Sequence, residues 1–174
     1  MRVLTVDYSF AKSGWAVMDL SSSKAEVIEQ GMIETDKDSE PIERIDYTIK
    51  ELDKLYNKYA VDLIIKEGAI MGSRATGTPV LKAHGALEYY CYNKLIPLEE
   101  MHNATMKAFA RNYLKEKNYT KEEIKKLGNK LIVAEFLKLW YNRDMSELYT
   151  PRGRYLEDIG DAYLIGIVYK NKKL

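Results

Sequence analysis

Residues 2–9 read RVLTVDYS, and this stretch decides the fold because its apolar, β-branched run leads directly into an acid, Asp7. Alternating β-branched residues predict a strand. The segments WAVMDL (15–20) and AEVIEQGMIE (25–34) have the same character, and Gly14 and the turn-forming SSSK separate the runs. We therefore expect three consecutive strands joined by short turns.

Helices alternate with two further strands in the rest of the sequence. Apolar residues recur at three- and four-residue spacing over 41–59, which predicts an amphipathic helix. The run AVDLIIKEGAIMG (60–72) predicts a buried parallel strand, and LIPLEEM (95–101) predicts a short fifth strand. Helices are expected over 80–93, 102–114, 120–140 and 157–169, with loops over 73–79 and 149–155. This order predicts an α/β fold, a mixed five-stranded sheet with three antiparallel then two parallel strands, flanked by helices.

Length and composition favour one compact domain spanning 1–174. The 174 residues are 46% hydrophobic and 30% charged, which is enough for one core and too little for two full domains. Cys91 is the single cysteine, so an intramolecular disulfide is excluded. The sequence shows neither a secretory signal at its start nor an apolar run near the ~20 residues that a membrane span needs. We expect a cytoplasmic protein with no membrane partner.

Charge is distributed unevenly along the chain. Residues 1–53 carry six basic and twelve acidic side chains, whereas residues 102–138 carry nine basic and four acidic ones. The later segment is suited to face a polyanion. A solvated helix face with mixed charges is the alternative interpretation.

Four acids interrupt apolar segments at places where structure would bring them together. Asp7 ends the first strand and Glu67 ends the fourth, and parallel neighbouring strands deliver such residues to one sheet edge. Asp158 and Asp161 are three residues apart on the last helix and share a face. Taken singly, each acid also fits a local hydrogen bond or a favourable charge at a helix N-terminus.

Gathered carboxylates repel one another unless cations lie between them. Mg²⁺, with Mn²⁺ as a substitute, prefers oxygen ligands, and two such ions roughly 4 Å apart stabilise an in-line displacement at phosphorus. Two histidines and one cysteine leave no set of zinc-ligand spacings. The acids therefore predict a site for two hard divalent ions.

The blocks DYSFAKSGWAV (7–17), LIIKEGAIM (63–71) and DIGDAYLIGI (158–167) resemble the three signature blocks of the RuvC family of Holliday-junction resolvases, in the RNase H-like superfamily. The resemblance implies an RNase H-like fold in which Asp7, Glu67, Asp158 and Asp161 are catalytic metal ligands. It also places Lys107 and Lys130 near the scissile phosphate. Short, divergent versions of this kind resemble those of phages of Gram-positive bacteria.

Two departures from the family pattern stand out. Tyr8 and Ser9 replace the usual proline and glycine after the first acid, and Ile70 stands where many resolvases place an aromatic residue. An aliphatic wedge can still unstack a base step. Basic and polar residues flanking the acids are expected to bind DNA backbone phosphates. With the wedge, the expected DNA-binding set is Ile70, Ser73, Arg74, Lys107, Arg111, Lys130, Arg152 and Arg154.

The resemblance implies a Mg²⁺-dependent endodeoxyribonuclease that cuts branched DNA, Holliday junctions in particular, with no nucleotide cofactor. In the family the helix corresponding to 80–93 makes a homodimer, whose symmetry matches that of a four-way junction. Three alternatives stay open: a nuclease acting on RNA–DNA hybrids or RNA, a non-catalytic nucleic-acid-binding module, and a phosphotransferase suggested faintly by DYSFAKSG.

Overall fold

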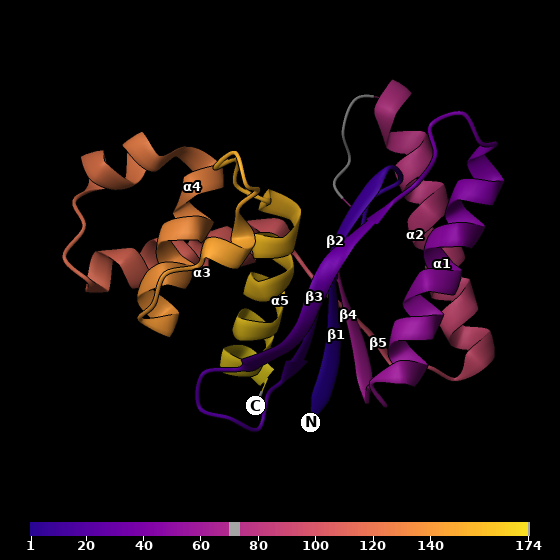
Figure 1. Cartoon of the computed structure of the whole chain (residues 1–174), viewed down its shortest axis with the longest axis horizontal. Coiled ribbons are helices and arrows are strands. Elements are labelled where there is room, and N and C mark those ends of the chain that lie inside the picture. The colour runs from indigo at the N-terminus through magenta and orange to yellow at the C-terminus, as the bar shows by residue number, and fades with distance from the viewer. Residues whose placement is uncertain (70–73, 174) are drawn as a thin grey trace.

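The structure is a computed structural model that describes residues 1–69 and 74–173, and its centre is a five-stranded sheet (Figure 1). Across the sheet the order is β3-β2-β1-β4-β5; β1 runs antiparallel to β2 and parallel to β4. This arrangement confirms the mixed sheet expected from the sequence. The strands are β1 (Arg2–Asp7), β2 (Lys12–Asp19), β3 (Glu26–Glu34), β4 (Leu63–Glu67) and β5 (Leu98–Met101).

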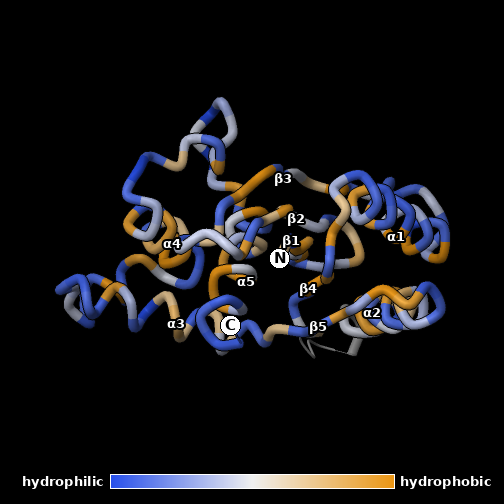
Figure 2. The backbone as a smooth tube through the Cα atoms, turned by 90° about the horizontal axis from the view of Figure 1, so that it is seen from below, coloured by the Kyte–Doolittle hydropathy of each residue, from blue (hydrophilic) through white to orange (hydrophobic). Residues whose placement is uncertain are grey.

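Helices cover both faces of the sheet. Helices α1 and α2 lie on one face, and α3, α4 and α5 lie on the other (Figures 1 and 2). In the described part of the chain, no helix is both long and apolar enough to cross a membrane. The helices are α1 (Pro41–Lys58), α2 (Arg74–Lys94), α3 (Asn103–Glu116), α4 (Lys121–Tyr141), the short 3₁₀ helix η1 (Ser146–Leu148) and α5 (Glu157–Lys173).

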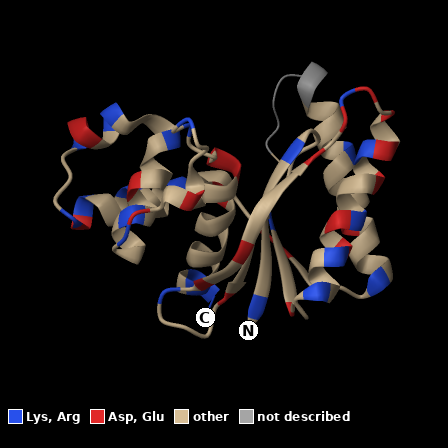
Figure 3. Ribbon diagram, viewed as in Figure 1, with Lys and Arg blue, Asp and Glu red and all other residues tan. Residues whose placement is uncertain are grey.

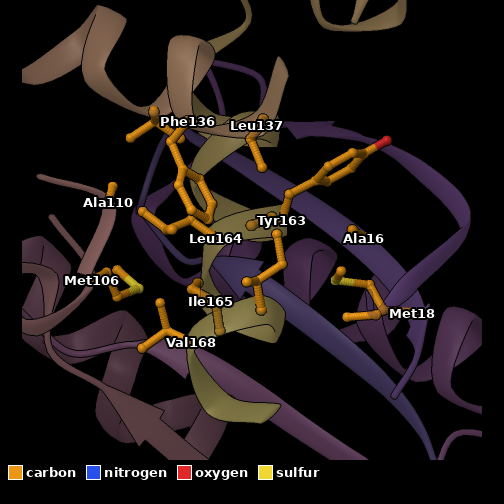
Figure 4. Packing of buried hydrophobic residues seen from close by; sticks show 14 of the residues in the cluster. Ala16, Met18, Met106, Ala110, Phe136, Leu137, Tyr163, Leu164, Ile165 and Val168 are labelled. Atoms are coloured by element: carbon orange, nitrogen blue, oxygen red, sulfur yellow. The ribbon is translucent and has the colours of Figure 1, made fainter. Parts of the chain in front are cut away.

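The alternation of side chains along the strands builds a separate core on each face. Val3 and Ile65 belong to the cluster around α5, whereas Leu4 and Ile64 belong to the cluster under α1 and α2. Figure 4 shows α5 packing Tyr163, Leu164, Ile165 and Val168 against α3, α4 and β2. Because successive strand residues point to opposite faces, Asp7 and Glu67 point toward α5, and Tyr8 and Lys66 point toward α2.

The loop expected over 73–79 is wrong from Arg74 onward, since α2 begins at Arg74 and contains Pro79. Proline removes one backbone hydrogen bond and usually ends a helix. Here Ala83, Leu87 and Cys91, four residues apart, are buried against the sheet. The free energy gained by burying this face outweighs the cost of the proline, because packing supplies most helix stability in proteins.

Candidate active site

Asp7 and Glu67 lie side by side at the carboxyl ends of β1 and β4. The parallel register pairs Val6 with Lys66, so the next residue of each strand is one of the two acids. Their carboxyl groups lie within hydrogen-bonding reach of each other. Burial raises the pKa of Asp7 well above its usual value, and the contact with Glu67 and its negative charge raise it further.

The last helix brings two more acids to this edge. Asp158 and Asp161 lie in the first turns of α5, and Asp161 is only 4% exposed. Burial raises the pKa of Asp161 to about 6, although the neighbouring Lys107 ammonium opposes the shift. Burial also raises the pKa of Asp158. Both acids are near enough to Asp7 for their charges to raise its pKa, so Asp7 lies within electrostatic reach of the other three predicted acids.

Gly14 explains how α5 comes so near the sheet. It pairs with Asp7 in the antiparallel register of β1 and β2. A Cβ at this position would overlap the backbone carbonyl of Asp158 and lie 2.6 Å from the amide nitrogen of Ile159. The absence of a side chain therefore lets the start of α5 lie directly on β2, beside the end of β1.

Helix α3 supplies polar partners for two of the acids. The ammonium group of Lys107, 6% exposed, forms an ion pair with Asp161. The side-chain amide of Asn103 donates a hydrogen bond to Glu67. Asn103 was not predicted from the sequence. The sequence feature that could have identified it is its position just after β5. The carboxyl end of β5 lies at the same sheet edge as those of β1 and β4.

A pocket of about 360 Å³ adjoins Asp158 and is lined by basic residues from three segments. Lys130 lies 2.8 Å from Glu157 and is itself 75% exposed. Arg154 and Lys12 complete the basic lining. Lys12 was not predicted, because its contribution depends on β2 passing beneath α5. Arg152 is exposed in the preceding turn and does not line this pocket.

A second basic pocket lies between α3 and α4. Arg111 donates a hydrogen bond of 2.8 Å from Nη2 to Oδ1 of Asn129, which orients the guanidinium group without neutralising it. Lys121 and Lys125 line the same pocket, whose wall includes the kink of α4 at Gly128 (φ 63°). In residues 1–69 and 74–173, these three cations have no acidic partner within ion-pair distance. Figure 3 shows basic residues on α3 and α4, in the lobe away from the sheet.

The remaining predicted DNA-binding residues follow Glu67. Ile70 and Ser73 lie outside the described residues. Arg74 is the first residue of α2.

The donor set at the sheet edge suits a hard cation. Two carboxyl groups held within hydrogen-bonding reach in a buried place need either a proton or a cation between them. The four acids do not form the tightest set of ligand atoms, however. In the described chain that set is His84, Glu88 and Glu100, whose ligand atoms all lie within 4.8 Å of one another, near α2. The structure therefore contains carboxylate clusters able to bind metal, without fixing the ion.

Comparison with known proteins adds independent information. No protein-family profile matches the sequence. The chain is 24% identical over 107 residues to the crossover junction endodeoxyribonuclease RuvC of Prochlorococcus marinus (strain MIT 9312), a match covering 62% of this chain and 68% of that protein.

Solved structures match over a greater length. RuvC of T. thermophilus in complex with Holliday junction substrate superposes with a TM-score of 0.68 at 15% identity, covering 99% of this chain and 96% of that one. The yeast mitochondrial Holliday junction resolvase Ydc2 superposes with a TM-score of 0.62 at 16% identity, covering 97% and 77%. In sequence and in fold, this chain is similar to RuvC.

Proposed function

We propose that this protein is a metal-dependent endonuclease that cuts branched DNA, and Holliday junctions in particular. The observation that carries the proposal is the Asp7–Glu67 carboxyl pair at the sheet edge, with Asp158 and Asp161 beside it. The similar Prochlorococcus protein is named a crossover junction endodeoxyribonuclease, and the T. thermophilus structure holds a Holliday junction. Residues 1–174 would act as one nuclease domain in the cytoplasm of a bacterial cell.

The four acids are the proposed ligands of two Mg²⁺ ions, with Mn²⁺ as a substitute. Such ions, when bound, polarise a phosphodiester and lower the pKa of water. Asp7 would hold the ions together with Glu67, Asp158 and Asp161, which all lie near enough to affect its pKa. Asn103 orients the Glu67 carboxylate by its hydrogen bond.

Two lysines complete the proposed catalytic set. Lys107 is nearly buried and holds Asp161 in place, and its positive charge is suited to offset negative charge that develops on a scissile phosphate. Lys130 extends from α4 into the pocket beside Asp158. Its exposed ammonium is suited to bind a backbone phosphate next to the cut.

Binding of DNA is assigned to the two basic pockets and the segment after Glu67. Phosphate contacts by lysine and arginine supply affinity without sequence preference. Among the described residues, no acid lines the Arg111 pocket, so this pocket is suited to a phosphate of a DNA arm away from the cut. The proposed DNA-binding set is Ile70, Ser73, Arg74, Lys107, Arg111, Lys130, Arg152 and Arg154.

A homodimer is proposed through the outer face of α2. Leu81, Tyr89 and Tyr92 are 45%, 69% and 78% exposed, and Leu95, just after the helix, is 87% exposed. Spacings of three to eight residues place the helical residues on one side. A second copy seated there would give two active sites related by two-fold symmetry, as two opposed nicks require.

A labelled synthetic four-way junction tests the function. With Mg²⁺ or Mn²⁺, the wild-type protein should make symmetrical nicks that EDTA abolishes. Asp7→Asn should bind the junction but not nick it, whereas Asp46→Asn, an exposed position on α1, should nick normally. A protein that binds junctions yet nicks none with either ion is a non-catalytic module, and faster cutting of an RNA–DNA hybrid would overturn the branched-DNA assignment.

A further inference from the structure

Lys66 is a nearly fully buried lysine next to Glu67. Its side chain is 1% exposed, on the face of β4 opposite that acid. The ammonium nitrogen lies 2.5 Å from Oε2 of Glu100, 3.1 Å from Oε1 of Glu88 and 3.1 Å from Nδ1 of His84. A buried charge is costly unless such partners surround it. We call these four residues the Lys66 cluster.

The partners of Lys66 form a ligand set for a divalent metal. Their ligand atoms all lie within 4.8 Å of one another, and one imidazole with two carboxylates is a common donor set for transition metals. The Lys66 ammonium contacts all three partners, so a metal ion could enter only by displacing it. The hydrogen bond from Lys66 lowers the pKa of Glu100, and burial followed by the charge of Lys66 lowers the pKa of His84. These shifts favour the carboxylate form of Glu100 and the neutral form of His84.

His84 connects this cluster to the strand that carries Asp7. Because Nδ1 of His84 faces an ammonium group, Nδ1 accepts, and Nε2 carries the proton and donates to the carbonyl oxygen of Tyr8 at 3.1 Å. Metal-binding histidines are held in the same way, with the second nitrogen donating to a carbonyl. Tyr8 directly follows Asp7, so the ring of His84 supports the end of β1.

Glu100 lies against the end of β4, as His84 lies against the end of β1. A Cβ on Gly68 would lie 2.7 Å from Oε1 of Glu100. The backbone amide of Gly68 also donates to the carbonyl of Met101 at 3.0 Å. The Lys66 cluster thus joins β1, β4, β5 and α2 directly behind the Asp7–Glu67 pair.

We infer that Lys66 is a built-in cation that takes the place of a metal ion in a His–Glu–Glu cage formed by His84, Glu88 and Glu100. Lys66 is also a positioning residue, because it keeps the ends of β1 and β4 together so that Asp7 and Glu67 meet. The positioning role rests on the proposed function, whereas the cage is independent of it. The two parts are therefore tested by different measurements.

Replacing the lysine tests the cage. Lys66→Ala leaves the three ligands in place, so Co²⁺ added to this variant should give the visible absorption of a histidine-ligated ion and raise its Tm. In the wild type and in Lys66→Ala/His84→Ala, Co²⁺ should give no absorption of a histidine-ligated ion and should raise the Tm only by the amount that binding at the four acids contributes, less than in Lys66→Ala. Equal Co²⁺ spectra in all three proteins, or no spectrum in any, would overturn the cage. If Lys66→Ala is unfolded without metal, its circular dichroism should recover when Co²⁺ is added. A failure to recover would overturn the cage.

Nicking kinetics test the positioning role. Lys66→Met should lower kcat for the junction at least tenfold, leave KM for DNA within about twofold, and weaken Mg²⁺ activation. The exposed Lys50→Met on α1 is the matched control and should change none of these. Co²⁺ bound in the cage of Lys66→Ala should restore part of the lost kcat, measured with Mg²⁺ also present. Unchanged kcat in folded Lys66→Met would refute the positioning role. A wild-type protein that nicks no junction would refute the proposed function, and the test of the cage would still apply.

Discussion

Asp7 carries an electrostatic cost in the folded protein. Its carboxyl group is buried next to Glu67, and both burial and that neighbour raise its pKa. An acid whose pKa is raised by folding binds its proton more tightly in the folded state. Its contribution to stability is therefore present at low pH and is lost as the pH rises through the raised value.

Asp7→Asn is expected to stabilise the metal-free protein at neutral pH, because it removes one of two facing acids. In EDTA its Tm should exceed that of the wild type by about 2–4 °C, or roughly 1 kcal/mol for a chain of this size. Mg²⁺ should raise the Tm of the wild type and have little effect on the variant. Thermal unfolding followed by circular dichroism measures both, and equal Mg²⁺ stabilisation of the two proteins would refute metal binding at Asp7.

At the scale of single residues, the sequence predicts the acids better than their partners. Asp7 and Glu67 stand out because each ends an apolar strand. Lys66 lies inside the same apolar run and looks there like an ordinary strand residue, since its partners are 18 to 34 residues away in sequence. Asn103 has no local signal beyond its place after a strand. Such residues become visible only once the register of β1, β4 and β5 is known.

At the scale of elements, the site depends on how closely α5 approaches β2. Gly14 makes that approach possible, since any side chain there overlaps the backbone of Asp158. Sequence alone predicts that Gly14 breaks the strand pattern. It does not reveal that α5 packs on Gly14, because α5 begins more than 140 residues later in the chain.

Gly14→Ala should therefore displace the first turn of α5 and damage the site. We expect a loss of about 1–3 kcal/mol in stability, as for overpacking in a core, and at least a tenfold loss in nicking rate. Ala11→Ser, at an exposed position in the neighbouring turn, should leave both unchanged. Denaturant unfolding and junction nicking measure the two effects. Nicking within twofold of the wild-type rate would contradict the role given to Gly14.

The exposed face of α2 leads to a second prediction at this scale. Tyr89→Ser/Tyr92→Ser should convert the proposed dimer to a monomer, because it removes two large apolar contacts from one helix side. Light scattering coupled to size-exclusion chromatography gives the mass directly. Tyr47→Ser, which removes a 47% exposed tyrosine from α1, is the control and should not change the mass. A wild type that is monomeric at every concentration would contradict the interface.

At the scale of the whole molecule, charge is separated along the chain as the sequence predicts. The basic excess of residues 102–138 resides in α3 and α4, and the acidic N-terminal part forms β1 to β3 and most of α1. The sequence could not show that Arg111, Lys121 and Lys125 line one pocket. Their meeting depends on the packing of α3 against α4 and on the kink at Gly128.

Arg111→Ala and Lys125→Ala should each weaken junction binding and reduce the slope of log K against log salt by about 1, because each removes one phosphate contact. Lys50→Ala on α1 should leave the slope unchanged. Fluorescence anisotropy over a series of salt concentrations measures it. If the two pocket variants keep the wild-type slope, DNA does not contact this pocket.

The proposed function requires divalent ions to bind at the end of β1. Anomalous diffraction from crystals of the wild-type protein soaked in Mn²⁺ tests it without any assay of activity. We predict anomalous density between Asp7 and Glu67, adjoining Asp161 or Asp158, and no density within the Lys66 cluster. Absence of Mn²⁺ beside Asp7, or density among His84, Glu88 and Glu100 alone, would contradict the account.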